Sequence, residues 1–408
     1  MQGIVHHMRI GNWLSRERVR RWLFIIFAME ILLSCMFVAG THGWLKPLPN
    51  PTSTDFVSFY AAGRLADSGT PWLAYDRAMH HLVEQQSTEP GIRYNYFYYP
   101  PTFLIVCALL ARLPYLFGFF ALQAATLAPC LLIVRAILRN PAPIMLLAFP
   151  AVFWTLGTGQ NAFLTASLFG SATLLLESQP ILAGLLFGAL CYKPHFGLLI
   201  PVALAAGGYW RCIAGAAISI IVLTASSLLL FGWDTWQAFL TAAVSSQSVY
   251  ATNAIDLAGL TSPYGALLVY GAAPAVARTA QAVVALMAAA LVALVWRRVP
   301  SLPIRAAVLI AATPVAVPIV MFYDLMLTGV AMAWLIRAGL DDGFPPWSRT
   351  ILAVLFMLPL LSGNLDSDSH LLIAPLSAMG GFLLALGFAW RARGERQMAN
   401  PERPNGLA

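Results

Sequence analysis

Long apolar runs follow one another along most of the chain, separated by short polar stretches. They fall at 22–44, 101–113, 115–134, 143–157, 160–177, 180–192, 195–208, 212–231, 274–296, 304–321, 322–338, 350–362 and 371–390. A helix needs about 17–25 apolar residues to cross the hydrocarbon core, and several runs are shorter. The pattern therefore predicts an all-α polytopic membrane protein with about 11–13 transmembrane helices, some of them broken or buried among others.

Three runs need separate comment. Pro314 and Pro318 predict a break in the run at 304–321, because proline ends or kinks a helix. The run at 22–44 follows a basic flank and is longer than the apolar core of a signal peptide, so we expect an uncleaved first span. Counting 101–113 as a full span puts the following loops on the wrong side, which leaves it open whether this run crosses.

The largest region between apolar runs covers residues 45–100. Phe56, Phe59, Tyr60 and Gly63 follow helical spacing, and a second helical piece is expected at 72–86. The aromatic stretch YNYFYYPP ends the region. These features predict two helices lying in the membrane interface, within a loop on the outer face.

Arginines lie in clusters between the runs, which indicates cytoplasmic ends by the positive-inside rule. They lie at positions 16, 18, 20, 21, 135, 139, 211, 297, 298, 305, 337, 349, 391, 393 and 396. We expect a cytoplasmic N-terminus (1–21), one transmembrane domain (22–391) and a cytoplasmic polar tail (392–408). The loop at 45–100 and the other polar motifs then share the periplasmic face of a bacterial inner membrane.

Composition supports the membrane assignment. The 408 residues are 59% hydrophobic and 10% charged, with a mean hydropathy of +0.74, whereas ordinary soluble domains carry about 25% charge. The net charge of +7 comes from the loop arginines, so no nucleic-acid partner is expected. The five cysteines lie in or beside apolar runs without a CxxC pair, which predicts packing rather than disulfide or metal chemistry.

Lys193 is one of only two lysines and lies between two apolar runs, with His195 two residues later. A charge there is costly unless it is paired or used, so we expect it to bind an anionic group such as a lipid phosphate. The alternative is a lysine that extends to the interface.

Other polar residues have two interpretations each. Gln160 and Asn161 follow Gly159, which suits either a substrate-contacting turn or a simple helix connection. Asp324 follows the proline-broken run, and it is either functional or paired with an arginine. Asp55 precedes a helix, where it is either an N-cap or a general base near the phosphate-binding lysine.

Five short motifs, in order, resemble a known family. DFVSFYAAGRL begins at Asp55 and is followed by YFYYPP, GQN, YKPHFGLL and FYDLML. This set resembles the bacterial DUF2029 proteins, glycosyltransferase family 87 of the GT-C class, which includes mycobacterial polyprenol-phosphate-mannose-dependent mannosyltransferases. The resemblance covers roughly residues 50–340.

The resemblance implies a GT-C fold and an inverting transfer of a sugar, mannose or another hexose, from a polyprenyl-phosphate donor to a lipid or glycan acceptor. It places the catalytic base at Asp55 and the K-P pair, beside the donor phosphate, at Lys193 and Pro194. The expected donor-phosphate residues are Lys193, His195 and Arg64. The expected substrate-binding residues are Tyr60, Tyr99, Gln160, Asn161, Tyr323 and Asp324. No cofactor and no essential divalent metal are expected, because no carboxylate cluster accompanies Asp55.

Two other classes stay open from the sequence. A transporter predicts internal repeats and matched broken helices, and neither is visible. An O-antigen polymerase-like or ligase-like enzyme typically has a large late periplasmic loop, whereas the largest loop here is the first. Loss of activity on Asp55→Asn distinguishes an enzyme with this base from a transporter or a scaffold.

Overall fold

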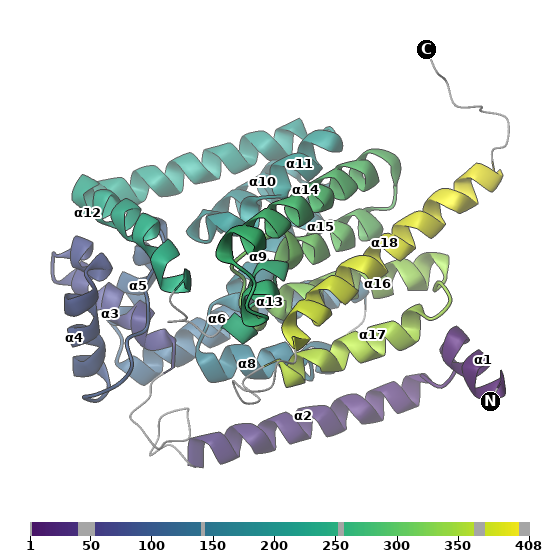
Figure 1. Cartoon of the computed structure of the whole chain (residues 1–408), viewed down its shortest axis with the longest axis horizontal. Helices are drawn as coiled ribbons and strands as arrows, with labels where there is room; N and C mark the ends of the chain where they lie inside the picture. Colours follow the sequence, from purple (N-terminus) through teal and green to yellow (C-terminus); the bar gives the residue numbers. More distant parts are fainter. Residues whose placement is uncertain (1, 40–53, 140–142, 252–256, 363–371, 400–408) are drawn as a thin grey trace.

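The computed structural model describes residues 2–39, 54–139, 143–251, 257–362 and 372–399, and over these ranges it is helical, with no sheet (Figure 1). Four helices are long and apolar enough to cross a bilayer. They are α6 (Tyr115–Leu138), α12 (Trp210–Ala251), α14 (Pro274–Arg298) and α18 (Ile373–Ala399). The predicted all-α membrane fold is therefore confirmed, while the count of 11–13 spans stays a prediction.

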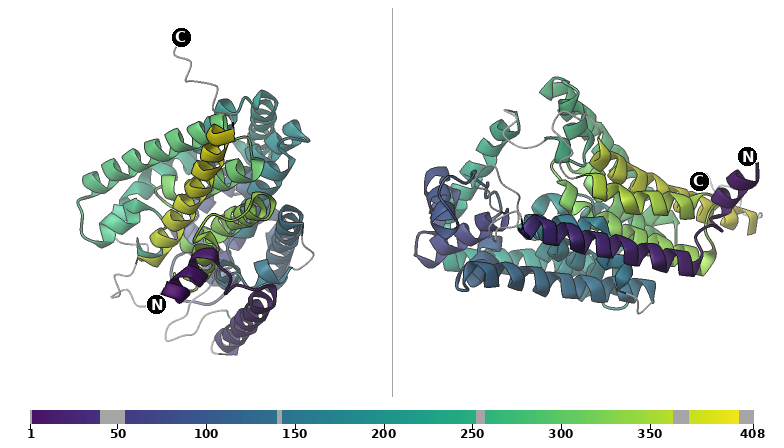
Figure 2. Two further views of the ribbon diagram at one scale, coloured as in Figure 1. Left: turned by 90° about the vertical axis from the view of Figure 1, so that its right-hand side faces the viewer. Right: turned by 90° about the horizontal axis from the view of Figure 1, so that it is seen from below.

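Other helices run between and beside these four, as Figure 2 shows from two further sides. They are α2 (Arg16–Ala39), α7 (Ile144–Leu147), α8 (Pro150–Thr158), α9 (Ala162–Leu175), α10 (Pro180–Ala189), α11 (Ile200–Ala206), α13 (Pro263–Val269), α15 (Leu302–Ala316), α16 (Met326–Asp342) and α17 (Ser348–Met357). A terminal helix, α1 (Gln2–Ile10), packs beside α17, where the Thr350 hydroxyl donates to the Met8 carbonyl at 2.7 Å and accepts from the Trp13 indole, just after α1, at 3.0 Å.

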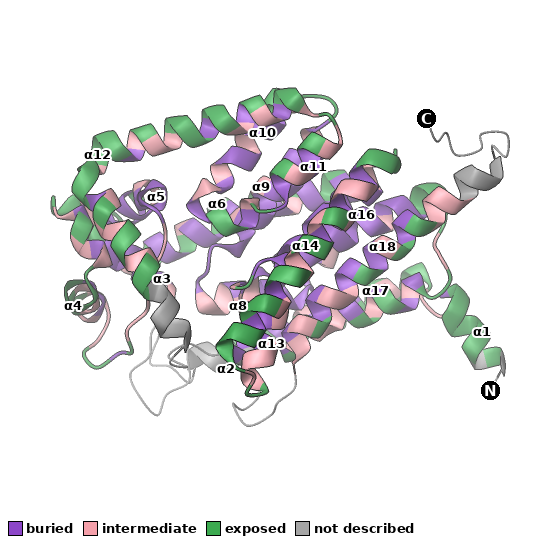
Figure 3. Ribbon diagram, turned by 45° about the horizontal axis from the view of Figure 1, so that its top comes forward, coloured by how far each residue is buried: buried purple, intermediate pink, exposed green. Residues whose placement is uncertain are grey.

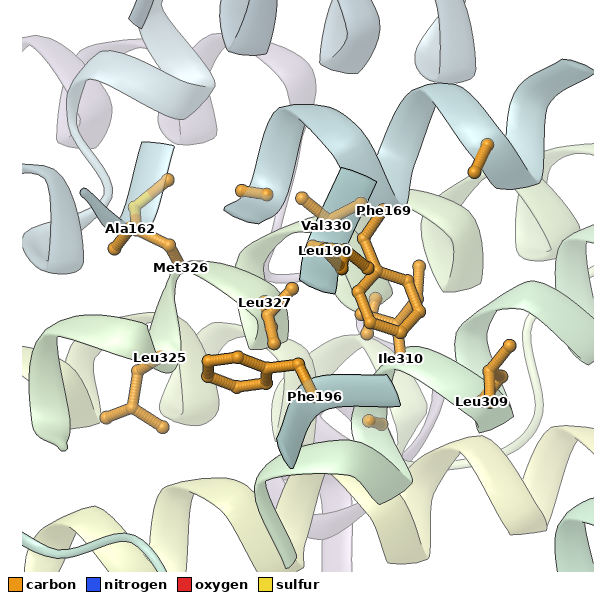
Figure 4. Packing of buried hydrophobic residues seen from close by; sticks show 14 of the residues in the cluster. Ala162, Phe169, Leu190, Phe196, Leu309, Ile310, Leu325, Met326, Leu327 and Val330 are labelled. Carbon is orange, nitrogen blue, oxygen red and sulfur yellow. The ribbon is translucent and has the colours of Figure 1, made fainter. Parts of the chain in front are cut away.

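The helices at the centre of the molecule are surrounded mostly by apolar side chains. Nearly every residue of α15 is buried, and α16 is buried along most of its length (Figure 3). Figure 4 shows how Phe169, Leu190, Phe196 and Leu327 pack in this core. The outward side of α12 is exposed instead, with Leu229 at 86%. An apolar surface of this kind is what a lipid-facing helix presents.

A helical cap closes one end of the molecule, at the left of Figure 1. The cap, residues 54–111, comprises α3 (Phe56–Asp67), η1 (Pro71–Tyr75), α4 (Arg77–Ser87) and α5 (Pro101–Ala111). The helix α5 packs against α3 and α12, and its 11 residues extend about 16 Å, against the roughly 30 Å of a hydrocarbon core. It therefore packs as part of the cap, and whether the run at 101–113 crosses the membrane stays a prediction.

Two features of this end differ from the expectation. The helix α3 is covered more fully than expected, because nine of its residues are buried beneath α4 and α5, and its place at the membrane interface stays a prediction. The segment after 231 is not a loop connection, because α12 continues to Ala251 across a kink at Gly232 (φ 78°). Residues 233–251 contain no proline, so nothing in the sequence ends the helix there. Of the expected loop at 45–100, residues 45–53 lie outside the described ranges, as do 363–371 and 400–408.

The predicted break after Pro314 is confirmed. The helix α15 ends at Ala316, and α16 begins at Met326 after η5 (Phe322–Leu325). The Gln281 amide donates to the carbonyl oxygens of Val315 and Ala316 at 3.0 and 2.9 Å. Buried helix ends need such partners for their carbonyl groups. The chain then leaves α15, and η5 places the Asp324 side chain in the interior.

Candidate active site

Asp55 precedes α3 and is held from two sides. Its backbone N–H donates to the Thr158 carbonyl at 2.8 Å, and its Oδ2 accepts from Gln160 Nε2 at 3.0 Å. The carboxylate does not cap α3, because Asp55 already has helical dihedrals (φ −59°, ψ −17°), whereas a capping side chain needs an extended residue. The side chain of Asp55 therefore faces the turn between α8 and α9 rather than its own helix.

The predicted turn at 159–161 is confirmed. Gly159 ends α8 at φ 70°, and a Cβ on it would lie 2.8 Å from the Cβ of Phe56. Only glycine fits this left-handed position under α3. Gln123 of α6 fixes the turn, since its Nε2 donates to the Gln160 carbonyl at 3.1 Å. The Gln160 side chain is thereby aimed at Asp55.

Asn161 is fully buried in the same turn, beside Tyr99. The Asn161 amide interacts with the Tyr99 hydroxyl, but this contact falls outside full hydrogen-bond geometry, and neither amide atom has another partner in the described part of the chain. A buried polar group without a partner costs about 1–3 kcal/mol. An amide in this state has both a donor and an acceptor to offer a bound molecule.

Tyr99 links this turn to the next part of the cluster. Its hydroxyl donates to Gln160 Oε1 at 3.3 Å, and its carbonyl accepts from the Tyr75 hydroxyl at 2.9 Å. Its ring lies parallel to that of Tyr192, with centroids 6.4 Å apart. Tyr192 immediately precedes Lys193, so the aromatic contact joins the two turns.

Lys193 forms a buried ion pair with Asp324. Its Nζ lies 3.0 Å from Asp324 Oδ1, and each side chain is only 5% exposed. The ammonium also lies over the rings of Phe196, Tyr323 and Tyr99, at 5.4, 5.6 and 5.9 Å from their centroids. Lys193 therefore does not extend to the interface, and the partner of Asp324 is a lysine and not an arginine.

The structure thus brings Asp55, Tyr99, Gln160 and Asn161 into one cluster with Lys193, Tyr323 and Asp324. Five separate segments of the chain supply these seven residues. Figure 4 shows that Ala162 and Met326, which follow Asn161 and η5, lie in the same packed region. Every contributing segment is a helix end or a turn.

Two other expected residues, Arg64 and Tyr60, lie apart from this cluster in their contacts, and a third, His195, borders it beside Lys193. Arg64 is exposed and nine residues after Asp55, about 13 Å along α3. The Tyr60 hydroxyl donates to the Leu113 carbonyl at 2.9 Å, which ties α3 to the start of α6. His195 is exposed, with its ring 4.6 Å from Phe196. Their expected substrate roles stay predictions.

A buried pair under α3 was not expected from the sequence. His80 Nε2 lies 3.0 Å from the Ser58 carbonyl, and its Nδ1 lies 3.7 Å from Glu84 Oε1. The Glu84 carboxyl accepts from the Asn95 backbone N–H at 3.2 Å. Burial raises the pKa of Glu84 to about 8 and lowers the pKa of His80 to about 4. The signal available was the helical i, i+4 spacing of a histidine and a glutamate.

Two further features of the described residues concern metals and cavities. These residues contain no group of three His, Cys, Asp or Glu side chains placed to hold a metal ion. A cavity of about 400 Å³ lies at the opposite end of the molecule, between α15, α16 and α18. It is lined by Ser301, Asp342 and Arg391 among others, and it is separate from the cluster around Asp55.

A polytopic helical membrane protein with a buried polar cluster at one end is the class that these features define. The model of glycosyltransferase family 87 matches residues 97–323, more than half of the chain, and the chain belongs to that family. No curated protein and no solved structure matches it. The matched range includes Tyr99, Gln160 and Lys193 and leaves Asp55 and Asp324 outside, so it is narrower than the resemblance expected over 50–340.

Proposed function

We propose that this membrane-embedded glycosyltransferase moves a hexose, mannose first among the candidates, from a polyprenyl-phosphate donor to a lipid or glycan acceptor. The reaction inverts the anomeric centre, and Asp55 is the general base. The observation that carries the proposal is the hydrogen bond that the Gln160 amide donates to the Asp55 carboxylate. This bond directs the carboxylate toward the interior cluster, and the carboxylate does not cap α3.

The proposed reaction forms one bond and breaks another, and each event takes place at a different end of the cluster. The acceptor hydroxyl oxygen attacks the anomeric carbon, while its proton passes to the Asp55 carboxylate. The bond from the anomeric carbon to the phosphate oxygen breaks on the opposite side, and the phosphate leaves with the electron pair. A phosphate leaves without a protonating acid, so one carboxylate suffices, in contrast to the two carboxylates of glycoside hydrolases.

Lys193 is placed to stabilise the departing phosphate. An ammonium carries three donors, and Asp324 accepts one of them. The remaining N–H groups and the positive charge favour an anion in a site shielded from water. Asp324 fixes the position of Lys193, and Tyr323 covers the pair. The amide of Asn161 supplies hydrogen bonds to the sugar or the phosphate.

The reaction is proposed to face the periplasm. The arginine-rich ends of α14 and α18 lie at the end of the molecule opposite the cap (Figure 1). Arginines favour the cytoplasmic side, which places the cap and the cluster on the outer side. The polyprenyl tail then lies in the bilayer beside the short helices, and the acceptor approaches through the cap. This orientation also keeps the proposed tail at 392–408 in the cytoplasm.

The experiment that tests the proposal is a transfer assay on the purified full chain in nanodiscs. The donor is radiolabelled polyprenyl-phosphate-mannose, and a total membrane-lipid extract is the acceptor pool. We expect a labelled product from the wild type and a loss of about 10²–10⁴-fold in rate for Asp55→Asn, as for other general bases. Asp67→Asn is the matched control, because Asp67 lies on the same helix and pairs with Arg112 at the surface.

Two outcomes contradict the proposal. Equal product from the wild type and Asp55→Asn removes Asp55 from the chemistry. Absence of product with this donor, and again with the glucose and galactose analogues, contradicts the polyprenyl-phosphate-hexose assignment. Movement of intact donor across the membrane without transfer favours the transporter alternative.

A further inference from the structure

The segment that joins α4 to α5 is rich in aromatic side chains. Residues 94–99 form neither helix nor strand, and Phe97 is buried while the tyrosines are only partly buried. Phe97 packs against Tyr75, and Tyr99 reaches Gln160 in the cluster described above. Tyr94, Tyr96 and Tyr98 contact one another and stay partly exposed, and the Tyr94 ring also rests on His80 and His81.

These three tyrosines form a continuous row, here called the tyrosine ladder. The rings of Tyr94 and Tyr96 are 4.7 Å apart, and those of Tyr96 and Tyr98 are 5.4 Å apart with planes only 15° from parallel. The exposed guanidinium of Arg77 lies 5.3 Å from the Tyr94 ring and 5.6 Å from the Tyr96 ring. The row thus combines partly exposed aromatic rings and phenol groups with one cation that lies over two of the rings.

The backbone of the ladder is fastened to the elements that hold Asp55. The Ser58 hydroxyl donates to the Tyr96 carbonyl at 3.2 Å, and Ser58 lies one turn after Asp55 on α3. The Asn95 N–H donates to the buried Glu84 carboxyl. A row fixed in this way is a preorganised surface, and preorganisation lowers the entropic cost of binding.

The chemistry of the row suits a sugar. The apolar C–H faces of a pyranose stack on aromatic rings, while its hydroxyl groups need donors and acceptors, and a tyrosine supplies both kinds of contact. Burial raises the pKa of Tyr98 to about 12, so this phenol keeps its proton at neutral pH. A lipid tail or an apolar protein surface would leave the hydroxyl groups and Arg77 without use.

We propose that the tyrosine ladder binds a saccharide unit of the acceptor and directs it toward Asp55. This inference rests on the proposed function, because it assigns the acceptor side of the same site. Tyr99 has Lys193 and the proposed donor phosphate on its inner side, and the ladder begins with its neighbour Tyr98. The donor therefore occupies the interior, and the face left for the second substrate is the ladder.

Saturation-transfer NMR on the full chain in nanodiscs tests this directly. The probes are di- and trisaccharides of mannose, glucose, galactose and arabinose at millimolar concentration. We expect the wild type to bind at least one of them, and the double variant Tyr96→Ala/Tyr98→Ala to bind it tenfold or more weakly, since a ring contact contributes about that factor. Phe117→Ala is the matched control, because Phe117 is an aromatic residue 71% exposed in the first turn of α6.

The variants in this experiment distinguish a failure of the ladder proposal from a failure of the proposed function. Asp55→Asn keeps the ladder, so it is expected to bind the saccharide like the wild type even though it does not transfer. Saccharide binding without any transfer by the wild type contradicts the proposed function alone. Binding of no saccharide by the wild type, or equal binding by the ladder variant, overturns the ladder proposal. Arg77→Gln and Tyr98→Phe change exposed or half-exposed groups only, so a loss of affinity in these folded variants supports it if the double variant fails to fold.

Discussion

The pairing of Lys193 with Asp324 shows how much one residue depends on a distant partner. Both side chains are buried, and the ammonium has aromatic rings on several sides. Loss of one member of a buried pair leaves an uncompensated charge in a medium that solvates it poorly. The pair therefore serves the fold as well as any chemistry at the site.

Asp324→Asn is expected to lower the free energy of unfolding by about 3–5 kcal/mol, the usual cost of breaking a buried pair. Thermal unfolding in detergent measures the change. Asp341→Asn is the control, since Asp341 pairs with Arg337 at 2.6 Å but is 41% exposed, and its loss is expected to cost no more than about 1 kcal/mol. The double variant Lys193→Met/Asp324→Leu is expected to regain most of the stability, and an equally unstable double variant contradicts this account.

The buried pair of His80 and Glu84 makes the stability of the cap depend on pH. Above pH 4.5 the unfolded chain ionises Glu84, whereas the folded chain keeps its proton until the pKa of about 8, so stability falls as pH rises across this window. Below pH 6.5 the unfolded chain protonates His80, whereas the folded chain does so only near its pKa of about 4, so stability also falls as pH drops across that window.

Glu84→Gln is expected to remove the loss on the alkaline side and keep the loss on the acid side. The melting temperature, measured between about pH 4 and about pH 8, the two pKa values, shows both slopes. Glu89→Gln is the control, because Glu89 lies partly exposed in the same cap, and it is expected to leave the profile unchanged. An alkaline slope that persists in Glu84→Gln means that another group causes it.

At the scale of elements, the cap depends on a close approach of two helices. A Cβ on Gly63 of α3 would collide with the Cys107 carbonyl of α5. The two helices can meet at this distance only because position 63 has no side chain, a device common in helix packing within membranes. This contact fixes α5 against α3, and it thereby helps to position Tyr99, which lies two residues before α5.

Gly63→Ala is therefore expected to destabilise the protein by about 1–3 kcal/mol through overpacking. Gly387→Ala is the matched control, since Gly387 lies in α18 and a methyl group added there would meet no atom within 4 Å. Alanine is the better helix former by up to about 1 kcal/mol, so the control is expected to gain stability. Chemical unfolding in detergent gives both values, and equal effects of the two changes argue against a tight α3–α5 contact.

The sequence predicted the helices better than it predicted their lengths and neighbours. Apolar periodicity and proline positions are local signals, and they located the break after Pro314 and the turn at Gly159. The continuation of the helix beyond Gly232 was missed, because a glycine at the end of an apolar run commonly ends a helix. The burial of α3 was missed because the partner that covers it, α5, was counted as a possible span.

The polar cluster was predictable in membership and not in pairing. Asp55, Gln160, Lys193 and Asp324 are polar groups next to apolar runs, and the topology places such groups on one side. The pairing of these four residues depends on how helices that are distant in sequence pack together. The hydrophobic periodicity of the sequence does not contain this information. The exposed position of Arg64 was not predicted for the same reason. The sequence shows its charge but does not show which face of α3 it occupies.

On the scale of the whole molecule, every contribution to the cluster comes from a turn or helix end at the cap side. Helices supply length and an apolar core, and their ends supply polar side chains and free backbone groups. This division lets the core around α15 and α16 stay mostly apolar while the chemistry collects in one layer. The cavity beside Arg391 lies outside that layer and has no part in the proposed transfer.

The separation of 131 residues between Lys193 and Asp324 also matters for how the chain is made. A ribosome that has released Lys193 into the membrane must still synthesise α12, α14 and α15 before the carboxylate emerges. During that interval the lysine lacks its final partner. A chain truncated before η5 therefore contains the buried ammonium without the carboxylate that compensates its charge.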